Sequence, residues 1–358
     1  MEREENAFPF MDDAAAKAIH IREKMKKLTA YHAQHCKAYR RMLEALQYDP
    51  EKVQHYRDIP FLPVGLFKEM TLSSLENEEN TKTVMSSGTS GQRRSQIVLD
   101  AETRTSQQQA LASIGSSFLG KKRLPMLVID CPSTVEKREK FTARTSGILG
   151  FSIFARKRVF ALKEDMSIDW EKVEEFLENY GNEPFLVFGF TFMVWQYFLL
   201  EIEQKGKGLN MEKGILIHGG GWKKLIQQAV SKEEYAQRLQ KACGIKRVID
   251  YYGMAEQTGS IFMECECGHL HCSDYSAILF RRAKDFSVCE KGEAGLIQVM
   301  SVLPKSYPGH SLLTEDIGRL LGEDDCPCGR KGPYFEVLGR AKHAELRGCS
   351  DTFAAEHS

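Results

Sequence analysis

A loop rich in serine and glycine, at residues 86–95, is the first segment whose side chains suit phosphate chemistry. It reads SSGTSGQRRS. Glycines permit unusual backbone angles, successive N–H groups can form an anion-binding nest, and hydroxyls donate further hydrogen bonds. It is not a Walker A loop, because it contains no G-x-x-x-x-G-K-[ST] pattern. Composition alone favours the alternative reading, an ordinary surface turn.

Two acidic positions are candidates for nucleotide chemistry. Glu256 follows a predicted strand in the segment YYGMAEQ, where its carboxylate could hold a magnesium ion on the phosphates of a nucleotide. Asp316 lies in TEDIG and is suited to accept hydrogen bonds from ribose hydroxyls, with Arg340 of a later Gly-Arg pair as its companion. A further Arg-Gly pair follows at 347–348. Each signal is weak by itself, since a solvated carboxylate after a turn is the common case.

The cysteines suggest a metal site. Five of the ten are scattered, at positions 36, 131, 243, 289 and 349, whereas the others form two short motifs, CECGHLHC at 265–272 and CPCG at 326–329. Zinc prefers four such ligands in a tetrahedron, commonly supplied by two separated knuckles. We expect a structural zinc site rather than a catalytic one, because the cluster can close the coordination shell; reduced thiols without metal are the alternative. The expected ligands are Cys267, His271, Cys326 and Cys328, with Cys265 or Cys272 as a substitute for one of them.

The elements that must position these residues alternate between strand-like and helix-like segments. This alternation predicts an α/β architecture with at least one largely parallel sheet. Residues 12–47 predict one or two amphipathic helices, for which packing is the expected role and membrane-surface binding the alternative. A shift towards Gly, Cys and charge after about residue 264 predicts a β-rich subdomain. The expected strands are 127–130, 185–190, 214–218 and 248–252, and the expected helices are 170–180, 192–203 and 232–243.

Composition narrows the class of protein. The sequence has 358 residues with 49 basic and 49 acidic side chains, so no positive excess points to nucleic acid. The first residues, MEREEN, are acidic and precede no apolar run, which argues against a secretory signal. The most apolar stretches, 185–189 and 192–200, are shorter than the roughly 20 residues of a membrane span. We therefore expect a soluble, cytoplasmic protein.

The order of the motifs along the chain is more informative about the class of protein than any single motif. A Ser/Gly loop, then Tyr-Gly-x-x-Glu, then Thr-x-Asp and a Gly-Arg hinge resembles the adenylate-forming superfamily of acyl-CoA and aryl-CoA synthetases, peptide-synthetase adenylation domains and firefly luciferase. Within it, the sequence is most similar to the acyl-protein synthetases of bacterial bioluminescence operons, the LuxE family, from about residue 50 onward. The matching stretches are FLPVGLFK (61–68), MSSGTSG (85–91), ILIHGGGW (215–222), DYYGMAEQTGS (250–260) and AKHAELRGCSD (341–351).

This resemblance implies a fold and a set of roles. The fold would be the adenylate-forming large domain, with mixed β-sheets flanked by helices and a small β-rich subdomain. Its parts would be a helical segment 1–50, a core 51–345 that includes the subdomain 264–335, and a tail 346–358. Glu256 would bind Mg²⁺, and Asp316 would hold the ribose of ATP with support from Arg340. The remaining nucleotide contacts would come from Ser86, Ser87, Gly88, Thr89, Ser90, Gly91, Arg94, Gly220, Tyr252 and Gly253.

Two departures from the superfamily accompany the resemblance. The phosphate loop usually ends in Lys, whereas Arg94 stands here, and Arg and Lys are not geometrically interchangeable. The sequence stops within about twenty residues of Arg340, so we expect no C-terminal lid with its catalytic Lys. Phenylacetate-CoA ligases, in the same superfamily, have a similar cysteine cluster.

The resemblance also implies a nucleophile, Cys349. The acyl-protein synthetases carry a cysteine near the C-terminus that accepts the acyl group, and a thiolate attacking an acyl-AMP would give an activated thioester. Arg347 would favour the thiolate, as would His343 if it lies close. A cysteine on a frayed tail is the structural alternative.

The expected function is thus ATP-dependent activation of a fatty acid, acylation of Cys349 and delivery of the acyl group to a partner acyl reductase. One alternative is a coenzyme A or acyl-carrier-protein ligase without self-acylation, and another is a catalytically silent nucleotide-binding subunit. The segment HGGG at 218–221 is also found beside the oxyanion hole of esterases. We interpret it as a tight turn near the nucleotide, because no G-x-S-x-G nucleophile elbow occurs in the sequence.

Overall fold

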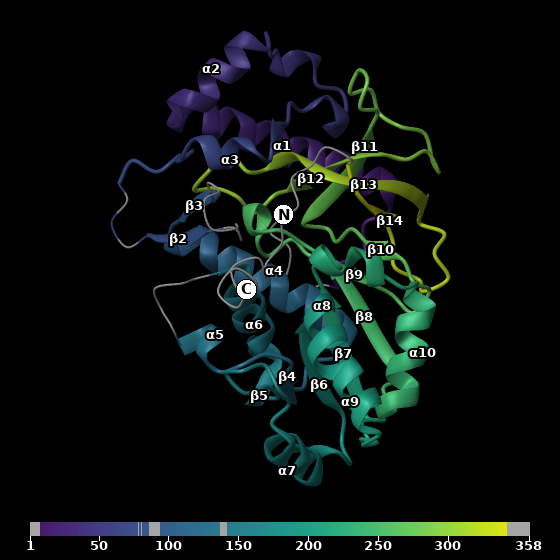
Figure 1. The fold of residues 1–358 in the computed structure, drawn as a ribbon. Coiled ribbons are helices and arrows are strands. Elements are labelled where there is room, and N and C mark those ends of the chain that lie inside the picture. The colour runs from purple at the N-terminus through teal and green to yellow at the C-terminus, as the bar shows by residue number, and fades with distance from the viewer. Residues whose placement is uncertain (1–7, 78, 80, 86–93, 137–141, 342–358) are drawn as a thin grey trace. The chain divides into compact units, whose positions relative to one another are not determined.

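The computed structural model describes residues 8–77, 79, 81–85, 94–136 and 142–341. The chain divides into two compact units. Figure 1 labels their helices and strands. The first unit consists of residues 1–86, 91–118 and 253–345, and the second of residues 87–90, 119–252 and 346–358.

The second unit is built on a parallel sheet. Its strands lie in the order β5-β4-β6-β7-β8, and every printed pairing between neighbours is parallel. β4, β6 and β7 are buried along their whole length, which explains why their sequences are continuous apolar runs rather than alternating patterns. The strands are β4 (Leu124–Val128), β5 (Ala155–Phe160), β6 (Phe185–Phe190), β7 (Gly214–Gly219) and β8 (Arg247–Tyr252).

The helices of this unit begin and end at local sequence signals. Asp169 caps α7 and Ser231 caps α10, each accepting a hydrogen bond from a backbone N–H of the first turn. Gly206 and Gly244 end their helices in the left-handed conformation. The expected helix 192–203 is present, but its middle is a π-helical turn. The elements are α5 (Ser133–Glu136), α6 (Ala143–Phe151), η3 (Ser152–Phe154), α7 (Trp170–Tyr180), α8 (Thr191–Met193), η4 (Val194–Leu199), α9 (Leu200–Lys205), η5 (Lys223–Gln228) and α10 (Lys232–Cys243).

The first unit is mainly antiparallel. Its strands follow the order β11-β12-β13-β14-β10-β9, β1 pairs with β13 in parallel, and β2 pairs with β3. The expected β-rich region is therefore present. Its strands are β1 (Leu62–Pro63), β2 (Lys82–Met85), β3 (Gln96–Leu99), β9 (Phe262–Glu264), β10 (Leu270–His271), β11 (Ser276–Arg281), β12 (Gly295–Ser301), β13 (Ser311–Glu323) and β14 (Pro333–Arg340). Its short helices are η1 (Pro50–Lys52), η2 (Tyr56–Asp58), α3 (Leu66–Glu69) and η6 (Ala255–Gln257), and α4 (Ala101–Leu119) belongs to it except for its last residue.

Two N-terminal helices, which the sequence predicts, belong to the same unit. They are α1 (Ala14–His35) and α2 (Lys37–Ala45). Figure 1 shows α1 beside β11 and β12, and one core cluster joins Ile21 and Met25 of α1 to Ala277 of β11 and Met300 of β12. The apolar side of α1 therefore packs into the core of the first unit. Among the described residues, no helix has the length and apolar character needed to cross a membrane.

Candidate active site and metal centre

Glu256 lies in η6, a single turn that follows β8 in the chain, and only 7% of the residue is exposed. Burial raises the pKa of its carboxyl, and the nearby charge of Glu315 raises it further. The Ser95 hydroxyl and the charge of Arg340 act in the opposite direction. A carboxylate taken out of water in this way gains most from a bound cation, whose charge favours the ionised form.

Asp316 and Arg340 face each other across β13 and β14. The Nε of Arg340 lies 3.4 Å from Oδ1 of Asp316, and its Nη2 lies 3.4 Å from Oε2 of Glu315. The backbone N–H of Asp316 donates to Thr314 Oγ1 at 3.1 Å, and the N–H of Ala341 donates to the carbonyl of Glu315 at 2.9 Å. The strand pairing therefore brings together the acidic residue and the arginine that the sequence singled out.

The chemistry available in this unit is that of cation and hydroxyl binding. The charges of Glu315 and Arg340 act on Glu256, and Arg340 also contacts Asp316, so these four ionisable side chains form one charge cluster. Carboxylate oxygens are the ligands that Mg²⁺ prefers, and they also accept hydrogen bonds from sugar hydroxyls. Glu315 and Ser95 were not among the expected site residues. Glu315 nevertheless lies in the motif TEDIG, directly before Asp316, and Ser95 is the last residue of the serine- and glycine-rich segment 86–95.

In the second unit, β7 ends in the glycine turn that the sequence predicts. Gly220 and Gly221 have φ values of 83° and 59°, and a Cβ at Gly219 would come within 2.6 Å of the carbonyl of Tyr251. Glycine is required here because the backbone is left-handed and closely packed. Tyr252 ends β8, and Gly253 follows it in the chain as part of the first unit.

His218 holds this turn by hydrogen bonds. The hydroxyl of Thr191 donates to the carbonyl of Gly219 at 3.1 Å, and Nδ1 of His218 lies 2.9 Å from the same hydroxyl oxygen. Because that hydroxyl proton is already committed, Nδ1–H of His218 is the donor to Thr191. Burial lowers the pKa of His218 to about 3, so the ring is neutral beside Asp250, 3.8 Å away. This geometry gives His218 a structural role in the turn.

Several expected residues fall outside the described part of the chain. These are the loop residues Ser86, Ser87, Gly88, Thr89, Ser90 and Gly91, the candidate nucleophile Cys349, and His343 and Arg347, which were expected to favour its thiolate. Arg94 is described and directly precedes Ser95 and the strand β3.

Cys265, His271, Cys326 and Cys328 form a compact cluster in the first unit. Their ligand atoms all lie within 4.8 Å of one another. The Sγ atoms of Cys265 and Cys326 are 3.9 Å apart, and Sγ of Cys328 is 3.3 Å from Nε2 of His271. A tetrahedral zinc ion with Zn–S bonds of about 2.3 Å separates two sulfurs by about 3.8 Å. The donor set and its spacing therefore fit a structural zinc ion.

The expected ligand Cys267 is not part of this cluster. Its side chain is exposed, while Cys265 is buried and takes the expected place of Cys267. Both C-x-C-G segments form the same turn, in which the glycine N–H donates to the carbonyl of the first cysteine, at 2.9 Å for Gly268 and 3.0 Å for Gly329. The N–H of Cys267 also donates to Sγ of Cys265 at 3.4 Å. Cys267 thus contributes its backbone and not its thiol.

Protonation in the cluster is compatible with metal binding. Burial lowers the pKa of His271 to about 4, which keeps the imidazole in the neutral form that metals bind. Burial raises the pKa of Cys265 to about 11, so this thiol becomes a thiolate at neutral pH only with a cation beside it. Cys272 is buried with a pKa raised to about 12 and lies outside the cluster. His269 was not expected, yet its Nδ1 lies 3.3 Å from Sγ of Cys326.

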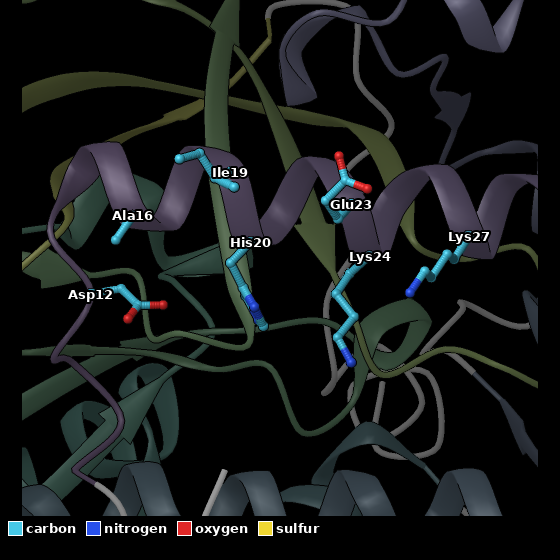
Figure 2. Close-up of a pocket in the computed structure, with 7 residues that line it drawn as sticks. All are labelled: Asp12, Ala16, Ile19, His20, Glu23, Lys24 and Lys27. Carbon is cyan, nitrogen blue, oxygen red and sulfur yellow. The ribbon is translucent and has the colours of Figure 1, made fainter. Parts of the chain in front are cut away.

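A surface recess of about 490 Å³ runs along α1 and has no part in the expected site. Figure 2 shows that its lining comes from the N-terminal part of the chain and carries side chains of both charge signs. The lining residues are Asp12, Ala16, Ile19, His20, Glu23, Lys24 and Lys27.

Solved structures of low sequence identity share this fold. The open conformation of 2-hydroxyisobutyryl-CoA ligase in complex with 2-HIB-AMP and CoA matches with a TM-score of 0.74 at 18% identity, over 96% of this chain and 82% of that one. The same ligase in its postadenylation state matches with a TM-score of 0.72 at 17% identity, over 95% and 73% of the two chains. The fold is that of the adenylate-forming ligases, which confirms the expected fold class.

Sequence comparison identifies the family. A long-chain-fatty-acid–luciferin-component ligase of Vibrio harveyi is 26% identical over 336 residues, which are 89% of this chain and 83% of that protein. Residues 9–357 match the family model of the acyl-protein synthetases, LuxE. The chain belongs to the LuxE family of acyl-protein synthetases, as its sequence motifs predict. It is therefore an enzyme, a ligase of the acid–thiol type.

Proposed function

We propose that the protein activates a fatty acid with ATP and transfers the acyl group to the thiol of Cys349. In the first step, a carboxylate oxygen of the acid attacks the α-phosphorus of ATP, the bond to the β-phosphate breaks, and pyrophosphate leaves. In the second step, the Cys349 thiolate attacks the acyl carbon, the bond to AMP breaks, and AMP leaves with the electron pair. The products are a thioester, AMP and pyrophosphate.

The observation that carries the adenylation step is the charge cluster of Glu256, Glu315, Asp316 and Arg340 in a chain of this family. Glu256, with its raised pKa, would hold Mg²⁺, which would offset phosphate charge when bound. The carboxylate of Asp316 would accept hydrogen bonds from the ribose hydroxyls. Arg340 would orient this carboxylate, since its Nε lies 3.4 Å from Oδ1 of Asp316. Loop 86–91 and Arg94 would bind the phosphates, while Gly220, Tyr252 and Gly253 would line the adenine.

Zinc at Cys265, His271, Cys326 and Cys328 would have a structural role. Three cysteines and one histidine would close a tetrahedral shell and leave no open position for a substrate. The site would join the turn before β10 to the turn before β14, two segments far apart in the sequence.

The choice of substrate and acceptor rests on the family. The Vibrio harveyi relative is named for long-chain fatty acids and a luciferin component, which supports a fatty acid as substrate. The resemblance to the bioluminescence acyl-protein synthetases implies a partner acyl reductase as the recipient of the thioester, and we propose that the transfer takes place in the cytoplasm. Transfer to coenzyme A is the second candidate, because the solved structures that share the fold include a CoA ligase with bound CoA.

Pyrophosphate exchange into ATP, measured with a panel of short to long fatty acids, tests the first step. Glu256→Gln should lower the exchange rate about a hundredfold or more, the order of effect seen when one preorganised charge-stabilising group is lost. Glu175→Gln, on the exposed side of α7, is the matched control and should behave as wild type. Wild-type protein that shows no acid-dependent exchange would refute the proposal and favour a silent nucleotide-binding subunit.

Intact mass before and after hydroxylamine tests the second step. We expect a hydroxylamine-labile acyl adduct after incubation with ATP, Mg²⁺ and the preferred acid. The adduct should be absent from Cys349→Ala and present in Cys289→Ala, in which a half-buried cysteine is replaced. Exchange without any adduct would transfer the acceptor role to coenzyme A or a carrier protein.

A further inference from the structure

The segment between β12 and β13, residues 303–310, packs against the turn that carries Glu256. Ser306 and Tyr307 are completely buried, and His310 is 1% exposed. Burying a connecting segment is costly unless its polar groups find partners. The partners of this segment show what it holds in place.

Hydrogen bonds fasten the Glu256 turn to this segment at two consecutive residues. The hydroxyl of Tyr307 donates to the backbone carbonyl of Glu256 at 2.8 Å. The side-chain amide of Gln257 donates to the carbonyls of Gly309, at 2.7 Å, and of Val299, at 3.2 Å. The first bond restricts the peptide group between Glu256 and Gln257, and the others hold the Gln257 side chain. Together they limit the direction in which the Glu256 carboxylate can point.

The same segment also fastens the strand that follows Ser95. The hydroxyl of Ser306 donates to the carbonyl of Val98 in β3 at 2.9 Å, and its N–H donates to Thr103 Oγ1 of α4 at 3.1 Å. Ser95 directly precedes β3, and its hydroxyl stabilises the ionised form of Glu256. One buried segment thus holds both the turn that carries Glu256 and the strand that follows Ser95.

The side chain of Tyr307 is tightly enclosed by its neighbours. The ring of Phe67, from α3, meets the ring of Tyr307 edge-on at a centroid distance of 6.0 Å. A Cβ on Gly309 would lie 2.1 Å from the Tyr307 ring. Burial holds the pKa of the Tyr307 phenol far above its usual value, so the hydroxyl remains a donor throughout the working range of pH.

We propose that Tyr307 is a positioning residue for adenylation, which fixes the Glu256 carboxylate for its magnesium ion through the hydrogen bond to the Glu256 carbonyl. This inference rests on the proposed function, in which Glu256 holds Mg²⁺. Tyr307 itself touches neither substrate nor metal. It acts on the backbone of the residue that does.

Tyr307→Phe removes one oxygen atom and keeps the ring contact with Phe67. The Glu256 carbonyl then loses its donor, and the carboxylate gains freedom. We expect kcat of the acid-dependent pyrophosphate exchange to fall about tenfold, the order expected for a lost buried hydrogen bond. The Mg²⁺ concentration for half-maximal rate should rise several-fold, and KM for the fatty acid should not change.

Two further variants separate positioning from general destabilisation. Tyr56→Phe removes a hydroxyl from another buried tyrosine of the same unit, which packs in the core beneath α1, and should leave rate and Mg²⁺ dependence unchanged. Ser306→Ala removes the hydrogen bond between the segment and Val98 of β3. It should raise the Mg²⁺ requirement, as Tyr307→Phe does.

The outcomes distinguish the two proposals. Wild-type protein without exchange activity would refute the adenylation function itself. Active wild type, with Tyr307→Phe within twofold in both kcat and Mg²⁺ requirement, would refute the positioning role alone. A rate loss in Tyr307→Phe that is matched by Tyr56→Phe, with no change in Mg²⁺ requirement, would also overturn it.

Discussion

At the scale of single residues, burial determines what each ionisable group can do. Glu256 is buried and has a raised pKa, whereas Glu175 or Glu233 on the surface can make only screened contacts. The same contrast separates two cysteines that lie two positions apart. Cys265 is buried and faces the sulfur of Cys326, whereas Cys267 is exposed to solvent.

Replacing these two cysteines tests the assignment of the metal ligands. Cys265→Ser should lose most of its bound zinc during dialysis, because one of four ligands is removed from a closed shell. Cys267→Ser is the matched control and should keep about one zinc per chain, since its contribution to the turn is a backbone N–H. Zinc per chain can be measured by inductively coupled plasma mass spectrometry. Retention by Cys265→Ser with loss by Cys267→Ser would restore the ligand set expected from the sequence.

At the scale of elements, α1 is attached to the rest of the first unit through two stacked, buried histidines, His32 of α1 and His310, which directly precedes β13. The rings of His32 and His310 lie 5.0 Å apart. Nδ1 of His32 accepts from the Ser74 hydroxyl at 2.8 Å, and Nε2–H donates to the carbonyl of Pro304 at 3.2 Å. His310 Nε2 lies 3.0 Å from Thr29 Oγ1 of the same helix. Neutral rings suit this arrangement, since two adjacent imidazolium ions would repel each other.

This arrangement predicts that acid weakens the protein in a defined pH window. Burial lowers the pKa of His32 from 6.5 to about 4, and burial lowers that of His310 as well. The unfolded chain therefore binds more protons below pH 6.5. The stabilisation is complete above that pH and is lost as the pH falls from 6.5 towards 4, by about 3 kcal/mol for His32 alone.

Urea unfolding at pH 7 and pH 5 measures this effect. His32→Gln keeps a donor and an acceptor but cannot titrate, so its loss of unfolding free energy between the two pH values should be smaller than that of wild type. The comparison isolates His32 from other buried histidines such as His218 and His271, which remain in both proteins. Equal losses in the two proteins would show that His32 does not contribute to the pH dependence.

At the scale of the whole molecule, the elements that the sequence predicts individually are those with local signals, such as β6, β7, α7 and α10. The apolar run FLVFGF gives β6 its bounds, and the capping residues Asp169, Ser231 and Gly244 give those of α7 and α10. The opposition of Asp316 and Arg340 depends on strand register, which no local pattern states. The contact of Tyr307 with Glu256 joins residues 51 positions apart, and nothing in the sequence around Tyr307 marks it. The choice between Cys265 and Cys267 depends on how a turn is oriented, and spacing alone does not encode that orientation.

The two units should respond differently to removal of metal. All four clustered ligands belong to the first unit, where they join the start of β10 to the turn before β14. Removal of the ion would break four metal–ligand bonds and leave three buried or half-buried thiols and an imidazole in their place. We expect the turns that carry these side chains to unfold locally. The parallel strands of the second unit derive their stability from apolar burial and contain none of these ligands.

Hydrogen exchange of the zinc-loaded protein before and after chelation tests this difference. We expect faster exchange in β9, β10 and β14, no change in β4, β6 and β7, and a Tm lowered by about 5 °C or more. Readdition of zinc under reducing conditions should restore both readings, which excludes oxidation of the cysteines as the cause. Cys267→Ser should respond as wild type does, because it keeps all four ligands. Equal acceleration in both units would mean that the ion supports the fold as a whole, and no acceleration would mean that the cluster is stable as free thiols.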